Sequence, residues 1–226
     1  MFVHEPPIEL KYSPLSVSYE NGDRFYEVEP GVLCPSITSV LSVNSKESIA
    51  KWRKRVGDEE ANKVSLKARF RGNEVHDLCE RFVKNEDQLI TGQQPTSIEM
   101  FNVLKPSLEK YLTKVYHVEV PLYSVSLGIA GRVDLIGEWM GIPAIIDFKT
   151  SAKPKRESWI SNYYMQCAGY SVMYEEMTGV KIEHGLVLIS VAGDMPKMQA
   201  FPAPVKDWIE PLKDTIRRYN DENQGC

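Results

Sequence analysis

Two short apolar segments near the middle of the chain each carry a carboxylate. Asp134 follows Val133 in the first segment, and Asp147 and Lys149 flank Phe148 in the second. Both segments have the composition of strands, along which side chains alternate. Asp147 and Lys149 are therefore predicted to share one face, and a neighbouring strand would bring Asp134 alongside. Buried carboxylates are costly without a partner, and a divalent cation is a frequent one.

An ion pair is the simpler alternative. Asp147 and Lys149 could neutralise each other inside the protein, with Asp134 in a turn, because structural ion-pair networks also occur. The residues between the two segments, Gly141 to Pro143, have turn composition and predict the connection between the strands.

Further polar groups lie on predicted helices. His76 lies beside an apolar stripe, where it could be a hydrogen-bonded core residue or a metal ligand. Gln166 and Tyr170 stand four residues apart, on one face of the helix expected after the Lys149 strand. Taken alone, that pair is a polar patch.

In chain order these motifs resemble the RecB-like branch of the PD-(D/E)xK nucleases, and four ordered motifs are more specific than any one alone. The motifs are Gly72-x-x-x-His76, Gly131-Arg132-Val133-Asp134, Asp147-Phe148-Lys149-Thr150-Ser151 and Gln166-x-x-x-Tyr170. The segments Cys34–Leu41, Lys51–Gly57 and Lys149–Lys155 extend the resemblance to the mitochondrial genome maintenance exonuclease group and its phage relatives.

The resemblance implies a divalent metal site. Its ligands would be His76, Asp134, Asp147 and the backbone carbonyl of Phe148, and such ligands suit Mg²⁺ or Mn²⁺. Lys149 would orient or deprotonate the attacking water and stabilise the transition state. Its pKa would fall if it were desolvated beside the cation. The sequence leaves open whether one or two metal ions bind.

Other residues would support catalysis or contact the substrate. Gln166 would act in catalysis by holding the scissile strand, with Tyr170 packed beside it. Thr150 and Ser151 could donate to a phosphate or satisfy the turn after their strand. Glu119 is expected to be an edge-strand carboxylate, with a position near the metal as the alternative.

The charge is low overall but unevenly distributed. A net charge of -4 argues against a generally cationic nucleic-acid binder. Between residues 51 and 71, however, eight basic residues stand against three acidic ones. From this run Lys51, Arg53, Lys54 and Arg55 are predicted to contact the substrate, with a solvated surface as the alternative.

A second basic run follows the predicted catalytic strand and favours phosphate contacts by Lys153 and Lys155. Trp52, Tyr163 and Tyr164 could be stacking platforms for unpaired bases or aromatic residues of the core.

The composition narrows the remaining possibilities. Cys34, Cys79, Cys167 and Cys226 are scattered, so neither a disulfide framework nor a zinc site is expected. Some RecB-like nucleases hold an iron–sulfur cluster with a close C-terminal group of three cysteines, and this chain is expected to hold none. The first residues resemble neither a signal nor a transit peptide, which predicts a cytoplasmic protein of a bacterial or phage-infected cell.

The expected fold is α/β, a restriction-endonuclease-like core with a central mixed sheet flanked by helices and an N-terminal helical extension. A single domain of 226 residues is predicted. It would comprise a hairpin segment over 1–44 with a turn at Asn21-Gly22, a helical region over 45–116, a catalytic sheet core over 117–204 and a C-terminal helix over 205–226. Within the helical region, Asn44 and Glu47 form a capping-box pattern, and further helices are expected from Asp58 to Lys84 and over 96–116.

The sequence therefore predicts a metal-dependent DNA exonuclease that prefers single-stranded ends and serves replication, repair or recombination. A double-strand or structure-specific recombination nuclease is the first alternative, and an inactive nuclease fold that binds DNA is the second. A monomer without membrane association is expected. The helices between residues 45 and 84 could cover the metal site as an arch for one strand, or pack flat on the sheet.

Overall fold

The centre of the protein is a five-stranded sheet with the order β4-β5-β6-β7-β8. The computed structural model describes residues 1–10 and 15–224. The strands are β4 (Leu112–Ser124), β5 (Ile129–Trp139), β6 (Ile142–Ser151), β7 (His184–Val191) and β8 (Lys197–Pro204). β6 and β7 run parallel and the other neighbours antiparallel, which confirms the predicted mixed sheet.

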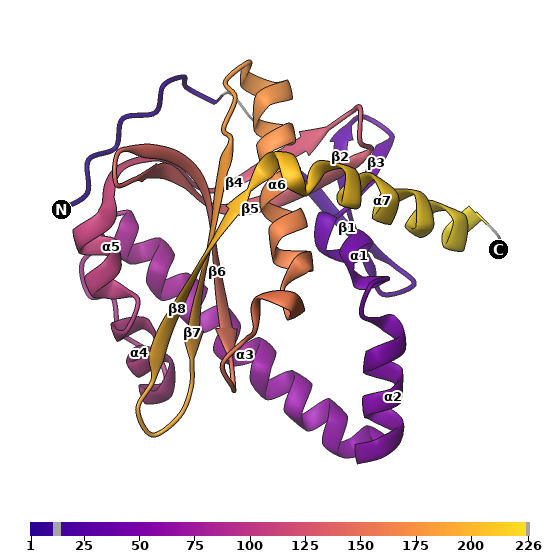
Figure 1. Ribbon diagram of the computed structural model, residues 1–226, viewed down its shortest axis with the longest axis horizontal. Helices are drawn as coiled ribbons and strands as arrows, with labels where there is room; N and C mark the ends of the chain where they lie inside the picture. The colour runs from indigo at the N-terminus through magenta and orange to yellow at the C-terminus, as the bar shows by residue number, and fades with distance from the viewer. Residues whose placement is uncertain (11–14, 225–226) are drawn as a thin grey trace.

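Helices cover both faces of this sheet (Figure 1). One face carries α3 (Asp58–Val83), α4 (Pro95–Asn102) and α5 (Lys105–Tyr111). The other carries α1 (Ile37–Ser42), α6 (Ser161–Thr178) and α7 (Ile209–Gln224). Short 3₁₀ helices, η1 (Glu157–Trp159) and η2 (Val205–Asp207), precede α6 and α7.

The sheet separates two hydrophobic cores. The first joins Leu135, Ile146 and Phe148 to side chains of α3, α4 and α5. The second joins Ile145 and Val187 to side chains of α1, α6 and α7. Adjacent residues of β6 thus point to opposite faces, as alternation along a strand requires.

A small three-stranded sheet packs beside β5. It contains β1 (Ser16–Glu20), β2 (Asp23–Glu29) and β3 (Val32–Pro35). The predicted hairpin turn is confirmed, because Asn21 and Gly22 both have positive φ, at 50° and 90°. Such a turn matches the twist of the two strands that it joins.

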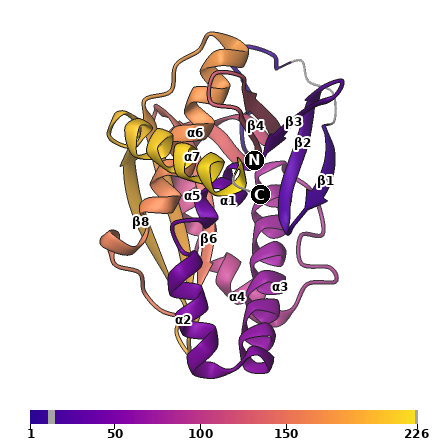
Figure 2. The ribbon, with the colours of Figure 1, turned by 90° about the vertical axis from the view of Figure 1, so that its right-hand side faces the viewer.

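A helical hairpin extends from the main body of the protein (Figure 2). It consists of α2 (Lys46–Val56) and the first half of α3. All residues of α2 are exposed or half-buried, and Ala61 is the buried residue among positions 58–70. In contrast, Val75, Leu78, Cys79 and Val83 are fully buried in the second half of α3. The sheet therefore supports the second half of α3, while the first half projects with α2.

The helix predicted over 96–116 is wrong in its second part. The structure has α4 and α5 up to Tyr111, and β4 begins at Leu112. Leu112 and Val115 are both buried on the α3 side although three residues separate them. The register of β4 shifts beside each of them, and such β-bulges give a strand a spacing that imitates a helix.

The predicted positions of one turn and one helix N-cap were also wrong. The turn between β5 and β6 lies at Met140-Gly141, both with positive φ, and Ile142 and Pro143 already belong to β6. Ser45, not Asn44, occupies the N-cap of α2. The Asn44 amide instead donates to Asn162 Oδ1 at 2.8 Å, so tertiary packing replaces the expected capping box.

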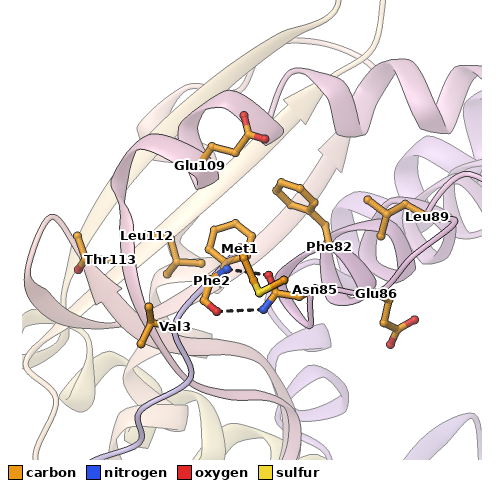
Figure 3. Close-up of a pocket in the computed structure, with 10 residues that line it drawn as sticks. All are labelled: Met1, Phe2, Val3, Phe82, Asn85, Glu86, Leu89, Glu109, Leu112 and Thr113. Carbon is orange, nitrogen blue, oxygen red and sulfur yellow. Dashed lines mark hydrogen bonds between the residues drawn. The ribbon is translucent and has the colours of Figure 1, made fainter.

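The N-terminal residues bind across the end of α3 (Figure 3). Asn85 bonds both backbone groups of Phe2, accepting from its N–H at 2.7 Å and donating to its carbonyl at 3.0 Å. The Phe2 and Phe82 rings meet edge to face at 5.1 Å. A pocket of about 570 Å³ lies here, on the α3–α5 side and separate from the residues predicted to do chemistry.

Among residues 1–10 and 15–224, no helix combines the length and the apolar character needed to cross a membrane. Cys34, Cys79 and Cys167 are buried free thiols. Cys226 lies outside the described residues.

Candidate active site

The sheet opens at the point where its carboxylates lie. β5 and β6 are paired as far as Leu135 and Ile146, while β6 continues beside β7 to Ser151. Beyond the last pair, the Phe148 N–H donates to Asp134 Oδ2 at 2.8 Å. A side chain therefore takes the place of a strand partner, and β5 and β6 form a fork around the predicted site.

Asp147 and Lys149 contact each other on one side of β6. Lys149 Nζ donates to Asp147 Oδ1 at 2.5 Å and to the Phe148 carbonyl at 3.3 Å. Nζ also lies 2.5 Å from Asp147 Oδ2, but this buried oxygen accepts no hydrogen bond from the described residues. The ion pair predicted as the alternative is thus present, and it leaves one carboxylate oxygen incompletely satisfied.

His76 reaches Asp134 from α3. Its Nδ1 lies 3.4 Å from Asp134 Oδ1, and its ring meets Phe148 edge to face at 6.3 Å. The motif glycine one turn earlier, Gly72, lies close to β6, since a Cβ there would be 3.6 Å from Thr150 Oγ1. The close approach of α3 to β6 therefore positions the imidazole over the fork.

Glu119 completes this cluster, although the sequence interpretation favoured an edge-strand role. Ligand atoms of His76, Glu119 and Asp134 all lie within 4.8 Å of one another. The register places Glu119 opposite Asp134, because Val118 pairs with Leu135 and Val120 with Val133 on either side. Cross-strand register is the signal that could have identified Glu119, and it becomes readable once the pairing of β4 and β5 is known.

The backbone of Glu119 is unusual. Its φ of 52° lies in the left-handed region, which costs a non-glycine residue about 1–3 kcal/mol. Such strain persists where the surrounding structure enforces it, and here it accompanies a carboxylate that is 16% exposed beside a second acid.

The donor set fits a hard divalent cation. Two carboxylates and an imidazole converge from β4, β5 and α3, and the Asp147 carboxylate and the Phe148 carbonyl lie on the adjoining strand. Oxygen donors with one imidazole suit Mg²⁺ or Mn²⁺. The compact cluster comprises His76, Glu119 and Asp134, whereas Asp147 is turned toward Lys149.

The charges of His76 and Asp134 support each other. Burial alone would raise the pKa of Asp134, but His76, Lys149 and the Phe148 N–H outweigh it and lower that pKa. Burial would likewise lower the pKa of His76, and the attraction of Asp134 reverses this and raises it. This pair is therefore held in its charged form.

The carboxyl groups of Asp147 and Glu119 tend toward the neutral form, whereas Lys149 tends toward the charged form. Burial raises the pKa of Asp147 to about 6, although Lys149 opposes the shift. Burial and the nearby Asp134 raise the pKa of Glu119 to about 7. Burial would lower the pKa of Lys149, but Asp147 and Asp134 raise it. In the ion pair alone, both carboxylates act on the ammonium, and the lowered lysine pKa expected beside a cation stays a prediction.

A cleft of about 540 Å³ opens over the fork. The predicted residues that line it are His76, Asp134, Lys149, Thr150, Gln166 and Tyr170. It also contains arginines from three elements that the sequence interpretation did not assign, namely Arg24, Arg69 and Arg132. Periodicity could have identified two of them. Arg69 lies two helical turns before His76 and so shares its side of α3. Arg132 lies two residues before Asp134 and so shares its face of β5.

Gln166 and Tyr170 form one wall of this cleft. Gln166 Nε2 donates to the Tyr170 hydroxyl at 3.4 Å, and this hydroxyl donates to the Arg132 carbonyl at 2.7 Å. A Cβ at Gly131 would lie 2.8 Å from the Tyr170 ring, so the glycine lets the ring cross β5. The second and fourth motifs are thereby joined through Tyr170.

The residues at the end of β6 and just after it differ in their surroundings. Thr150 is half-buried at the cleft, whereas the buried Ser151 hydroxyl donates to the Lys153 carbonyl at 2.6 Å. The Ser151 hydroxyl therefore uses its donor in the turn after β6. The Lys155 backbone bonds Gln199 through both its N–H and its carbonyl, at 2.8 and 3.0 Å.

The basic residues of α2 lie in solvent or in surface ion pairs. Lys51 pairs with Glu47 at 2.5 Å, and Arg53 pairs with Asp58 at 2.7 Å. Lys54 and Arg55 are exposed. These side chains belong to the projecting hairpin.

The three aromatic residues considered for base stacking also differ in their surroundings. Tyr164 is buried and packs on Trp208 at 5.0 Å, so it belongs to the core. Tyr163 is half-buried, with its ring centroid 5.3 Å from Lys149 Nζ. Trp52 is half-buried on α2.

Comparisons with known proteins identify relatives of this chain. The family model of the PD-(D/E)XK nuclease superfamily matches residues 44–224. The chain is also similar to mitochondrial genome maintenance exonuclease 1 of Mus musculus, with 22% identity over 205 residues. That match covers 85% of this chain and 57% of the mouse protein, so the chain spans little more than half of its relative.

Solved structures give weaker likenesses. A candidate exonuclease from Eubacterium rectale is similar with a TM-score of 0.48 and 13% identity, over 69% of this chain and 68% of that chain. SSO0001 is similar with a TM-score of 0.32 and 22% identity, over 63% of this chain and 74% of that one.

Proposed function

Because the chain belongs to the PD-(D/E)XK nuclease superfamily, we propose that it is a divalent-metal-dependent DNA exonuclease that prefers single-stranded ends. One observation carries this proposal. His76, Glu119 and Asp134 converge within 4.8 Å at the fork, next to the ion pair of Asp147 and Lys149. Cation ligands and a lysine at one opening of the sheet are what phosphodiester hydrolysis requires.

The residues of the chain would divide the chemistry. His76, Glu119, Asp134 and Asp147 would hold the cation, which when bound supplies a Lewis acid and an acidified water. Lys149, held by Asp147 and the Phe148 carbonyl, is placed to donate to that water or to a phosphoryl oxygen. The ammonium would then stabilise negative charge that develops in the transition state.

The cleft walls would hold the DNA strand. Gln166 is fixed by Tyr170 and faces the cleft beside Lys149, which suits a contact with the strand being cut. Arg24, Arg69 and Arg132 add positive charge from three directions and could bind neighbouring phosphates. The similarity to a mitochondrial exonuclease and the projecting α2–α3 hairpin support action at a free end.

A substrate panel tests the proposal. End-labelled linear and circular DNA, each single- and double-stranded, would be incubated with Mg²⁺, Mn²⁺ or EDTA. We expect release of short products from linear single strands with either metal, resistance of the closed circle, and no cleavage in EDTA. Full cleavage in EDTA would contradict the metal mechanism, and efficient cutting of the closed circle would make the protein an endonuclease.

A further inference from the structure

Trp159 is an exposed tryptophan with no role in the site described above. It is 61% exposed, at the end of η1 in the connection between β6 and α6. Tryptophan is highly buried on average, so an exposed indole is the informative exception. Figure 1 shows this connection on the side of the sheet where α6 begins.

Hydrogen bonds and packing hold the backbone that carries the indole. The backbone N–H of Trp159 donates to the Arg156 carbonyl at 2.9 Å, and the next residue, Ile160, is completely buried. On the other side, the two backbone hydrogen bonds of Lys155 attach the connection to Gln199 in β8. A contact on such a fixed ring loses little conformational entropy on binding.

A basic residue packs on the ring, and two more precede it in the chain. The Arg156 guanidinium lies 5.2 Å from the ring centroid, and Lys153 and Lys155 precede it in the same connection. The acid in η1, Glu157, accepts a hydrogen bond from the Tyr164 hydroxyl at 3.3 Å. An exposed aromatic ring among cations is the combination that binds an unpaired base and its phosphates.

Trp159 is connected to the catalytic lysine through Tyr163. Tyr163 contacts Lys149 with its ring, and Trp159 lies four residues before Tyr163. Four residues span at most about 14 Å even when fully extended, so a strand that passes Lys149 and Tyr163 can reach the indole.

We propose that Trp159, flanked by Arg156, is a stacking platform for an unpaired base next to the scissile phosphate. This inference rests on the proposed function, because the occupant is the DNA strand held in the catalytic cleft. A duplex end would have to fray before a base could stack there, so the platform would favour single strands.

Equilibrium binding with a matched set of proteins and oligonucleotides tests the platform. The proteins are wild type, Trp159→Ala, Trp159→Phe and Ile142→Ala, the last changing an exposed apolar residue at the opposite end of β6. The probes are fluorescein-labelled single strands, intact or with one abasic site at each successive position from the end. Anisotropy is measured with Ca²⁺ in place of Mg²⁺.

We expect Trp159→Ala to weaken binding of the intact strand by about 5- to 100-fold, with Trp159→Phe and Ile142→Ala near wild type. The loss should disappear for the strand whose abasic site coincides with the stacked base, as in a double-mutant cycle. Equal affinity of Trp159→Ala and wild type for the intact strand would overturn the platform. An equal loss for every abasic strand would also overturn it, because the effect would then not depend on a base.

Cleavage assays separate this inference from the proposed function. The binding test needs no turnover, so a Trp159-dependent, base-dependent affinity would support the platform even for an inactive protein. Cleavage by wild type together with unchanged binding by Trp159→Ala would reject the platform and leave the nuclease proposal standing. Failure of wild type to bind any single strand would reject both.

Discussion

The fork between β5 and β6 and the hairpin of α2 with α3 both carry many charges, but in opposite environments. At the fork, the side chain of Asp147 is 1% exposed and that of Lys149 is 18% exposed, with their charged atoms in contact. On α2, the side chain of Lys51 is 75% exposed and its partner Glu47 is 83% exposed. The charges at the fork are buried and fixed by neighbouring protein groups, whereas those on α2 are hydrated by solvent.

This difference determines what a mutation should do. A buried charge depends on each neighbour, because losing one partner leaves the other uncompensated. Exposed charges are screened by salt and act almost independently, so each contributes little. Changes at the fork should therefore abolish a chemical step, whereas changes on the hairpin should weaken binding gradually.

Lys149→Ala should give the largest effect. We expect turnover to fall by at least about 10²- to 10⁴-fold while DNA binding stays within a few-fold, because the variant loses a transition-state contact. Single-turnover cleavage and anisotropy would be measured side by side, with Lys206→Ala in η2 as the control. A large loss of binding with unchanged turnover would make Lys149 a docking residue and remove the contrast between the two regions.

Glu119→Gln should have the next largest effect. The amide keeps the shape but removes the charge that would balance a cation, so we expect the affinity for Mn²⁺ to fall by at least about 10-fold. Calorimetric titration of metal into the protein measures this. Glu138→Gln is the matched control, since the Glu138 side chain is 18% exposed on β5 compared with 16% for Glu119. Identical affinities for wild type and Glu119→Gln would return Glu119 to an edge-strand role.

The residues of the fork also show which features of the fold and the site can be predicted from the sequence. Alternation predicted the contact of Asp147 with Lys149, and helical periodicity placed His76 on α3. Both are short-range rules that need no knowledge of the fold. The mixed sheet followed from the order of strands and helices, which is similarly local information.

Glu119 and Arg24 needed long-range information. Glu119 joins the cluster through its register with Asp134, and Arg24 reaches the cleft from a separate small sheet. The bulges at Leu112 and Val115 show the same limit, because a three-residue spacing fits a helix until the partner strand is known. Pairing between distant segments, not residue composition, decides such positions.

Charge reversal on α2 should have a smaller effect. Lys54 and Arg55 are exposed, so Lys54→Glu/Arg55→Glu should fold normally and bind single strands a few-fold more weakly. We expect the dependence of log affinity on log salt to become shallower by about 0.7 for each lost phosphate contact. Titrations at several salt concentrations would be compared with Lys206→Glu/Lys213→Glu, a reversal on η2 and α7. An unchanged salt slope would show that α2 is an ordinary solvated surface.

The smallest expected effect is on stability without metal. The pKa of Asp147 is raised to about 6 and that of Glu119 to about 7, mainly by burial. The raised pKa of His76 adds to the same tendency. The folded protein therefore binds more protons than the unfolded chain between about pH 4.5 and 7, and its stability should fall as the pH rises through this window. The lowered pKa of Asp134 acts oppositely, but below its ordinary value.

Thermal unfolding in EDTA at pH 5.5 and 7.5 measures this dependence. We expect a melting temperature a few degrees higher at pH 5.5, since each kcal/mol corresponds to about 2–4 °C in a protein of this size. Glu119→Gln should reduce the difference because it removes one titrating carboxyl, whereas Glu138→Gln should leave it unchanged. Saturating Mg²⁺ should stabilise the protein most at pH 7.5, where the carboxylates are ionised and binding to the folded state raises its stability. A pH dependence identical in wild type and Glu119→Gln would mean that the fork does not store the repulsion between its carboxylates, and that its charges behave like those of the exposed hairpin.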